Sequence, residues 1–450
     1  MTTNEPNNHG LYVPKKSRRD FLRTGIAAGT AAAMSSATHA FAAPGDEIKI
    51  GLIGCGGRGS GAAGQALSSG NYNFKLWAMA DAHQDRLDSA AKNLANKNKE
   101  QFAVTDERKF VGLDAYEKVL ATCDLVILAT PPGFRPYHFE AAVNAGKHVF
   151  MEKPVAVDAP GVRKVLEMGK VAASKGLKVV AGLQRRYQNC YREALKQVKE
   201  NNIIGDIVGG QVYWNSAGVW VKEREAGQTE LQYQLRNWYY FNWLCGDHIN
   251  EQHIHNIDVA NWFIGSTPVS AQGMGGRQVR TGKEFGEIYD HHYVEYTYAN
   301  GVRINSQCRH QKNCENPVRE EFAGTKGILY LDNGGRCYAN DYKGNTIWRY
   351  RPIGEDRKDP DPYQTEHNEL QDAILNGKPL NNAEYVAHST MTSILGRFAT
   401  YTGKEIKWEQ ALNSTTQLMP NKVTWDTVPP TKPDENGFYP VATPGVTKLV

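Results

Sequence analysis

The sequence predicts an α/β protein with an N-terminal doubly wound parallel sheet of the dinucleotide-binding type, followed by a second domain rich in extended segments. Three observations predict this class. A β-branched strand at 47–54 runs into a glycine-rich turn at 54–59, GCGGRG. Strands and helices then alternate as far as residue 182. An acidic residue, Asp81, ends the second strand about 20 residues after the turn.

Composition and charge exclude several classes of protein. The chain has 450 residues, of which 40% are hydrophobic and 22% charged, as expected of a globular protein with two domains. Its net charge is +4, and residues 1–43 hold five basic and two acidic groups, so the remainder is nearly neutral. This argues against nucleic acid or an anionic membrane as a partner. The seven scattered cysteines lack CxxC spacing and predict neither a disulfide framework nor a zinc finger.

The N-terminus reads as a targeting signal. Residues 17–23, SRRDFLR, match the twin-arginine export pattern, and a weakly apolar stretch follows to about residue 37. The segment Ala40-Phe41-Ala42, with alanines at its small-residue positions, then offers a cleavage site between Ala40 and Ala43. We therefore expect residues 1–43 to be a signal peptide, the partner to be the twin-arginine export machinery, and the mature protein to be periplasmic. No later apolar run is long enough to span a bilayer.

The glycines of the turn have separate roles in cofactor binding. Gly54 allows the tight turn, Gly56 lets the backbone approach a pyrophosphate, and Gly59 permits close packing of the following helix, 60–67. The start of that helix offers free N–H groups to phosphates. We expect Gly57 and Arg58, in the same turn, to contact the cofactor as well.

The end of the second strand predicts which nicotinamide cofactor binds. Asp81 follows the strand 75–80, where an acid accepts hydrogen bonds from the adenine-ribose hydroxyls and repels a 2′-phosphate. NAD is therefore favoured, although Arg86 nearby leaves NADP possible. A third strand, 124–130, runs into two prolines, and we expect Thr130 and Pro131 to contact the cofactor. A helix at 136–144 and a strand at 147–151 complete the core of a domain assigned to residues 44–165.

Helices and strands of a second kind follow this domain. Helices are expected at 159–175 and 190–201, with a strand at 178–182 between them. Extended segments then dominate, and the last contains a hairpin with Asn300 and Gly301 at its turn; these segments are 207–215, 269–280 and 288–310. After about residue 412 the chain is rich in Pro, Thr and Asn, and we expect residues 416–450 to form a surface tail.

The strand ending at Met151 opens into Glu152, Lys153 and Pro154, and here the sequence resembles the Gfo/Idh/MocA family of glucose–fructose oxidoreductase and inositol dehydrogenase-like proteins. The resemblance spans residues 48–408, and its supporting segments are GCGGRG at 54–59, ATPP at 129–132, AGKHV at 145–149, GLQRRY at 182–187 and GTKG at 324–327. It implies a Rossmann domain followed, here over residues 166–415, by an α+β domain with a large, open, mostly antiparallel sheet. Because that sheet often forms the subunit interface, we expect a homodimer or homotetramer.

The resemblance also implies roles for individual residues. Lys153 is expected beside the nicotinamide, bonded to the reacting oxygen, with Glu152 orienting it and bordering the cofactor. In the polar segment 246–258, which we expect to begin a helix at Gly246, a stripe forms at about 100° per residue; its members are Asp247, Glu251, His255 and Asp258. The family pattern Asp-x-x-x-His-x-x-Asp implies that His255 is the catalytic base. Glu251 stands where the family has Asp, which affects the substrate geometry.

The same polar segment and the residues after the strand 178–182 offer candidates for metal binding and for substrate contacts. In a strand, His253 and His255 with Glu251 could ligate a divalent ion; in the expected helix they diverge, so no metal is predicted. Arg185, Arg186 and Tyr187 follow a strand that ends near the cofactor, and we expect them to contact substrate together with Asp258. The aromatic cluster 238–243 fits either stacking against a sugar or packing in the core, and both interpretations stay open. We expect structural roles for His291, His292, His310 and His367.

Together these features predict a nicotinamide-dependent oxidoreductase that acts on a secondary alcohol of a sugar, cyclitol or sugar derivative. Free NAD is scarce outside the cytoplasm, so a tightly held cofactor is expected. One alternative is a glycoside-cleaving enzyme that uses NAD transiently, although that branch of the family resembles Glu-Val-Pro where this chain has residues 152–154, EKP. The other alternative is a non-catalytic sugar-binding protein on the same fold.

Overall fold

Six parallel strands form the first sheet of the computed structural model, which describes residues 47–70 and 73–448. The expected signal peptide lies outside these residues. The strands pair in the order β3-β2-β1-β4-β5-β6. Their bounds are β1 (Ile48–Ile53), β2 (Phe74–Asp81), β3 (Lys109–Val111), β4 (Leu125–Leu128), β5 (His148–Met151) and β6 (Val179–Ala181). All five pairings are parallel, so the prediction of a doubly wound Rossmann sheet is confirmed.

Helices connect these strands and supply most of their covering. They are α1 (Gly57–Leu67), α2 (Gln84–Lys97), α3 (Ala115–Leu120), α4 (Arg135–Asn144) and α5 (Ala159–Ser174). The central strands β1, β4 and β5 are apolar and almost wholly buried, as expected when helices cover both faces of a sheet. The sheet continues beyond residue 165, where the sequence placed the domain boundary, because β6 pairs with β5 from residue 179 onward.

A nine-stranded sheet forms the second layer, in the order β14-β13-β12-β11-β7-β10-β9-β8-β15. Only the β7–β10 pair within it is parallel, which confirms the mostly antiparallel sheet. The strands are β7 (Ile207–Ser216), β8 (Ser270–Gly276), β9 (His291–Thr297), β10 (Arg303–His310), β11 (Val318–Gly324), β12 (Gly327–Asp332), β13 (Tyr338–Asp341), β14 (Thr346–Arg349) and β15 (Ile406–Lys407). The hairpin between β9 and β10 turns at Gly301, which has a φ of 84°.

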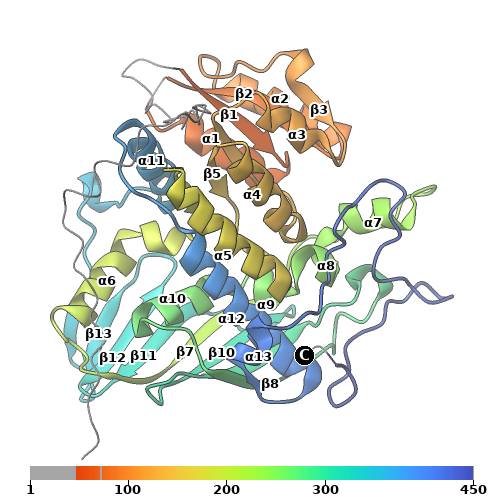
Figure 1. The fold of residues 1–450 in the computed structure, drawn as a ribbon. Helices are drawn as coiled ribbons and strands as arrows, with labels where there is room; N and C mark the ends of the chain where they lie inside the picture. Colours follow the sequence, from red (N-terminus) through yellow and green to blue (C-terminus); the bar gives the residue numbers. More distant parts are fainter. Residues whose placement is uncertain (1–46, 71–72, 449–450) are drawn as a thin grey trace, which may run out of the picture. The chain divides into compact units, whose positions relative to one another are not determined.

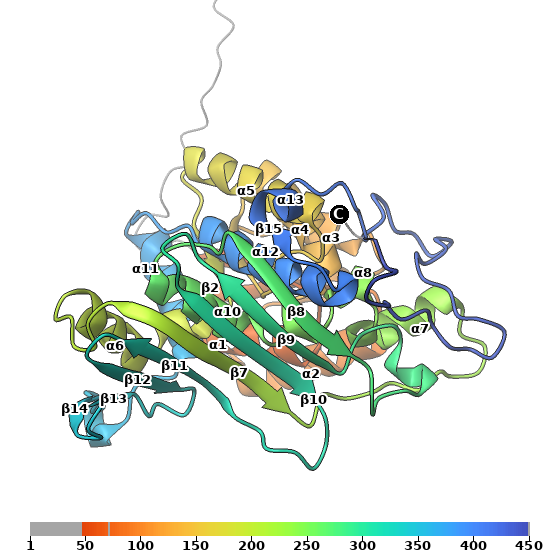
Figure 2. The same cartoon turned by 90° about the horizontal axis from the view of Figure 1, so that it is seen from below.

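Helices cover one face of this sheet and leave the other open (Figures 1 and 2). The remaining helices are α6 (Asn189–Lys199), α7 (Glu230–Arg236), α8 (Asn242–Cys245), α9 (His248–Glu251), α10 (Ile254–Ile264), α11 (Pro362–Leu375), α12 (Ala383–Thr402) and α13 (Trp408–Leu412). The long helix α12 lies against β8 and β9 on one side and against α5 on the other. It therefore joins the two sheets through one continuous core. None of the described helices is long and apolar enough to cross a membrane.

Candidate functional site

The glycine turn between β1 and α1 is shaped by the absence of side chains. Gly54 has a φ of +95°, and a Cβ there would lie 2.6 Å from the backbone of Ala129. A Cβ on Gly59 would lie 1.9 Å from the carbonyl oxygen of Gly54. The helix can therefore pack this closely on the turn only because residues 54 and 59 are both glycine. In contrast, a Cβ on Gly57 would meet no atom within 4 Å. The space in front of the N-terminus of α1 is thus open to a phosphate group.

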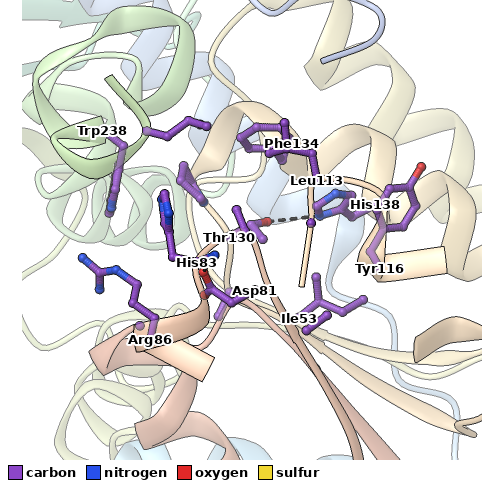
Figure 3. A pocket seen from close by; sticks show the side chains of 18 residues that line it. Ile53, Asp81, His83, Arg86, Leu113, Tyr116, Thr130, Phe134, His138 and Trp238 are labelled. Atoms are coloured by element: carbon purple, nitrogen blue, oxygen red, sulfur yellow. Dashed lines mark hydrogen bonds between the residues drawn. The ribbon is translucent and has the colours of Figure 1, made fainter. Parts of the chain in front are cut away.

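A cleft of about 700 Å³, counted with its open mouth, lies at the carboxyl ends of β1, β2 and β4. Figure 3 shows that His83, Arg86 and Trp238 line one side of this cleft, whereas Phe134 and His138 line the other. Asp81 stands at its floor. This is the crevice at which the strand order of a doubly wound sheet reverses and where nucleotides bind. The cleft fits the adenosine half of a dinucleotide.

Asp81 accepts hydrogen bonds from the backbone of the glycine turn and retains further acceptor positions for a ribose. Its Oδ2 accepts a hydrogen bond from the backbone N–H of Cys55 at 2.7 Å, and its Oδ1 accepts one from the N–H of His83 at 2.9 Å. Burial raises the pKa of Asp81, although these N–H groups act in the opposite direction. Each carboxylate oxygen has a second acceptor direction, which the ribose hydroxyls of NAD would use.

A buried arginine that the sequence did not single out fixes the strand ends next to the cleft. Arg135 donates from Nη2 to the carbonyl oxygen of Thr130 at 2.6 Å and from Nε to that of Glu152 at 3.0 Å. The hydroxyl of Thr130 lies 3.1 Å from Nδ1 of His138. Arg135 is only 1% exposed, and burial lowers its pKa to about 10. Because it joins β4 to the segment after β5, it positions the backbone that presents Lys153.

Glu152 and Arg58 pair with each other across the mouth of the turn. The Nε of Arg58 donates to Oε1 of Glu152 at 2.5 Å, and its guanidinium lies over the ring of Tyr363. The expectation that Glu152 orients Lys153 through its side chain is therefore wrong, because the carboxylate is directed to Arg58 and Lys153 bonds a different acid. That Arg58 and Glu152 contact the cofactor stays a prediction.

Lys153 and Glu251 form a buried ion pair, and His255 lies near it. The Nζ of Lys153 donates to Oε1 of Glu251 at 2.9 Å and to its carbonyl oxygen at 2.5 Å. Oε2 of Glu251 has no hydrogen-bond partner among the described residues. The ring of His255 stacks on Trp214, with 5.7 Å between centroids, and its Nδ1 also lacks a partner within the described part of the chain. Residues far apart in sequence thus leave an acceptor and a ring nitrogen available to a ligand.

Burial and neighbouring charges set the protonation of these groups. Burial raises the pKa of Glu251, although the charge of Lys153 opposes this shift. Burial, followed by the charges of Lys153 and Arg185, lowers the pKa of His255 well below its usual 6.5. His255 is therefore neutral at pH 7, and a neutral imidazole can accept the proton of an alcohol.

The polar segment forms two short helices instead of the single helix expected from sequence. After α9 the regular hydrogen-bond pattern breaks: the N–H of His253 bonds the carbonyl of His248, five residues back, and that of His255 bonds the carbonyl of Gln252, three residues back. The helix therefore ends at Glu251 and begins again at Ile254, which divides the predicted stripe. Asp247, the N-cap of α9, faces away from the Lys153 pair and toward Tyr289 and Tyr401. Only Glu251 and His255 of the stripe remain in the neighbourhood of Lys153.

The predicted substrate contacts have internal partners. Arg186 makes two hydrogen bonds to Asp258, at 2.8 and 2.9 Å, and lies over the ring of Tyr385. The hydroxyl of Tyr187 donates to Asn382 at 2.7 Å. These pairs hold the short helix η4 (Gln184–Tyr187) against α10 and against the N-cap of α12. Their placement favours a positioning role over direct contact with substrate.

Arg185 differs from its neighbours because part of its guanidinium stays unpaired. It forms a fully buried ion pair with Glu320, which also accepts hydrogen bonds from Tyr191 and Asn256. Burial raises the pKa of Glu320 to about 7, although Arg185 opposes the shift. Nε and Nη2 of Arg185 have no hydrogen-bond partner in the described residues. Of the predicted substrate contacts, Arg185 best retains donors for a ligand.

The aromatic cluster divides between the two roles left open by the sequence. Tyr239, Tyr240, Phe241 and Trp243 are buried core residues, whereas Trp238 lines the nucleotide cleft (Figure 3). Sequence reasoning missed Arg135, Trp214 and Glu320, each a single residue without a local pattern. Trp425 of the C-terminal segment was also missed; its ring lies 6.2 Å from that of His83, at the edge of the cleft.

These features define the class of the protein: a Rossmann-fold protein with an open nucleotide cleft and a buried group of a lysine, an acid and a neutral histidine. Residues 48–183 match the model of an oxidoreductase family with an NAD-binding Rossmann fold, and residues 193–330 match the model of the GFO/IDH/MocA C-terminal domain. Together the two matches cover more than half of the chain. The protein therefore belongs to the Gfo/Idh/MocA family.

Curated relatives and solved structures agree with this assignment. The chain is 28% identical over 289 residues to inositol 2-dehydrogenase of Pseudomonas fluorescens, covering 63% of this chain and 74% of the relative. The corresponding enzyme of Rhizobium meliloti is 27% identical, with coverages of 64% and 76%. Aldose-aldose oxidoreductase of Caulobacter crescentus aligns with a TM-score of 0.63 at 18% identity, covering 80% of this chain and 99% of that one. Scyllo-inositol dehydrogenase of Lactobacillus casei, solved with NAD(H) and scyllo-inositol, aligns with a TM-score of 0.59 at 22% identity, covering 81% and all of that chain.

Proposed function

We propose that this protein oxidises or reduces a secondary alcohol of a sugar, cyclitol or sugar derivative, with NAD as the hydride carrier. The observation that carries the proposal is the grouping of Lys153, Glu251 and neutral His255 where the strand β5 ends, beside the open glycine turn. Relatives named inositol 2-dehydrogenase support a polyhydroxylated ring as the substrate class.

The residues divide the work of alcohol oxidation. His255 takes the hydroxyl proton of the substrate, and the ammonium group of Lys153 stabilises the negative charge that develops on that oxygen. Glu251 holds Lys153 through its Oε1, and its free Oε2 accepts a hydrogen bond from a second substrate hydroxyl. NAD, which the turn at 54–59 and the carboxylate of Asp81 would hold, would supply the hydride acceptor for the same carbon. Reduction runs these steps in reverse.

The test is a spectrum of the mature protein, from about residue 44 onward, recorded before and after a panel of sugars and cyclitols is added. We expect a reduced-nicotinamide band near ~340 nm to appear with one class of substrate. Lys153→Ala and His255→Ala should each lower the rate by about 10²–10⁴-fold while leaving nucleotide binding intact. Lys164→Ala, at a partly exposed pair on α5, is the matched control.

Two outcomes would favour other functions. Cleavage of a glycoside with no net change in the band would indicate the glycoside-cleaving alternative. Binding of sugar and nucleotide with no redox change for any compound would indicate a binding protein. Failure to bind any nicotinamide nucleotide would contradict the proposal outright.

We further propose export through the twin-arginine machinery, a periplasmic location, and NAD that stays tightly bound through purification. The sequence at 17–23, SRRDFLR, supports the route, and a carrier retained on the protein suits a compartment in which free NAD is scarce. Fractionation of cells that produce the wild type or an Arg18→Lys, Arg19→Lys variant tests the location. Retention of the variant in the cytoplasm is the expected result.

A further inference from the structure

A second group of ionisable side chains lies at the start of α9, separate from the Lys153 pair. Asp247 and His248 are 0% exposed and His292 is 3% exposed. One potential ligand atom from each lies within 4.8 Å of the others. Oδ1 of Asp247 is 2.8 Å from Nδ1 of His248 and 3.3 Å from Nε2 of His292. Buried charges and imidazoles gathered this closely need a compensating partner.

We propose that Asp247, His248 and His292 bind one zinc ion beside the buried ring of His310. Two imidazoles with one carboxylate form a ligand set that Zn²⁺ prefers, and three protein ligands leave a fourth position for water or another group. The ion would replace contacts between ligand atoms that now face one another directly. This set differs from the one formed by Glu251, His253 and His255, which helix geometry separates.

The hydrogen bonds around His292 orient it as a ligand. Its Nδ1 lies 2.9 Å from the hydroxyl of Thr400, and that hydroxyl is within hydrogen-bond distance of the carbonyls of Gly396 and Arg397, at 3.2 and 3.1 Å. When the Thr400 hydroxyl donates to one of these carbonyls, it accepts from Nδ1–H of His292, and the lone pair of Nε2 then faces Asp247. Two acceptors then oppose each other unless a cation lies between them. An outer partner that fixes the tautomer of a ligating histidine is the usual arrangement at metal sites.

Imidazole nitrogens without a hydrogen-bond partner lie beside this cluster. Nε2 of His248 and both ring nitrogens of His310 have no hydrogen-bond partner in the part of the chain that the structure describes. His310 is 1% exposed, and its ring centroid lies 4.5 Å from that of His248. Buried polar atoms are nearly always paired, so several unpaired nitrogens at one place indicate a missing ligand.

The backbone at Asp247 is strained to deliver its side chain to this point. Asp247 has φ 73° and ψ 162°, a conformation that residues other than glycine rarely adopt. Its Oδ2 is held by the N–H of Tyr289 at 3.0 Å and the hydroxyl of Tyr401 at 2.5 Å. Oδ1 accepts a hydrogen bond from the backbone N–H of His248 at 2.5 Å and also faces the imidazoles of His248 and His292. Because Asp247 caps α9, whose last residue is Glu251, an ion here would also fix the carboxylate that holds Lys153.

Metal analysis of the mature protein, purified without a histidine tag from zinc-supplemented cells, tests the proposal. We expect about one zinc per chain in the wild type and less than about a tenth of that in His292→Ala. His291→Ala is the matched control, because the neighbouring side chain is partly exposed and pairs with Asp290, so it should keep its zinc. Wild-type protein without zinc that takes up none when titrated with Zn²⁺ would show an internal hydrogen-bonded network only and overturn the proposal.

Cobalt substitution uses the wild-type protein, so its result does not depend on whether the His292→Ala variant folds. Protein stripped with a chelator and reloaded with Co²⁺ should show the visible absorption bands of tetrahedral cobalt with nitrogen ligands, and these should titrate to one equivalent. Absence of these bands would contradict the site. Nucleotide binding is measured in parallel, so that loss of the zinc site and failure of the dehydrogenase proposal are distinguished.

Discussion

His255 illustrates how position in the fold sets the chemistry of a single residue. Its burial beside Lys153 lowers its pKa well below 6.5. Protonated His255 cannot accept a proton, so the rate of alcohol oxidation should fall as pH decreases, but only well below pH 6.5. The pH dependence is measured as the pre-steady-state rate of reduction of bound NAD. His255→Gln should lower the rate by about 10²–10⁴-fold and remove this decrease at low pH. A decrease centred above pH 6.5 in the wild type would contradict the assignment of His255 as the base.

Asp81 should set the preference between the two nicotinamide cofactors. Asp81→Asn keeps an oxygen for the N–H of Cys55 but removes the charge that repels a 2′-phosphate. We expect the ratio of kcat/KM for NAD to that for NADP to fall by about tenfold or more, a change of about 1.4 kcal/mol, as Arg86 in the same cleft attracts the added phosphate. Asp88→Asn, on the exposed side of α2, serves as the control. An unchanged ratio would show that another residue selects the cofactor.

At the scale of elements, the segment after α13 does more than cover the surface. The carboxylate of Asp158 accepts hydrogen bonds from the N–H groups of Leu418 and Met419, at 2.8 and 3.2 Å, which anchors the segment beside the Rossmann domain. This places Trp425 next to His83 at the cleft. Trp425→Ala should raise the Kd of NAD by about five- to tenfold, measured by titration calorimetry. Val428→Ala is the control: this side chain is 62% exposed, and its removal should leave the Kd of NAD unchanged. Equal affinities in both variants would exclude a contribution of Trp425 to cofactor binding.

Local sequence patterns predicted the helices and strands well, whereas the interactions that they did not predict join residues far apart in sequence. The glycine turn, Asp81 and the strand before Lys153 were predictable because each depends on neighbours in sequence. The pairs that fix the site were not, since Arg186 meets Asp258 across 72 residues and Arg185 meets Glu320 across 135. The break between α9 and α10 was also unpredictable, because no proline or glycine marks it.

At the scale of the whole molecule, the uncovered face of the nine-stranded sheet is the surface best suited to a second copy of the chain (Figure 2). Met274 is 75% exposed and Tyr293 is 39% exposed on neighbouring strands of this face. We expect a dimer or tetramer by light scattering, and Met274→Glu should shift it toward monomer. Val446→Glu, equally exposed in the C-terminal segment, should not. A monomeric wild type would contradict this interface.

The single parallel pair in the second sheet has a consequence for the order of folding. Strand β7 lies between β10 and β11, and everything from α7 to β9 is inserted between β7 and β10 in sequence. The middle of the sheet therefore closes only after a loop of nearly 90 residues has been synthesised, and closing such long loops slows folding. Glu251 and His255 belong to that loop. The proposed catalytic groups thus come together late, as the central strands pair, so a refolding chain should regain helical signal well before it regains activity.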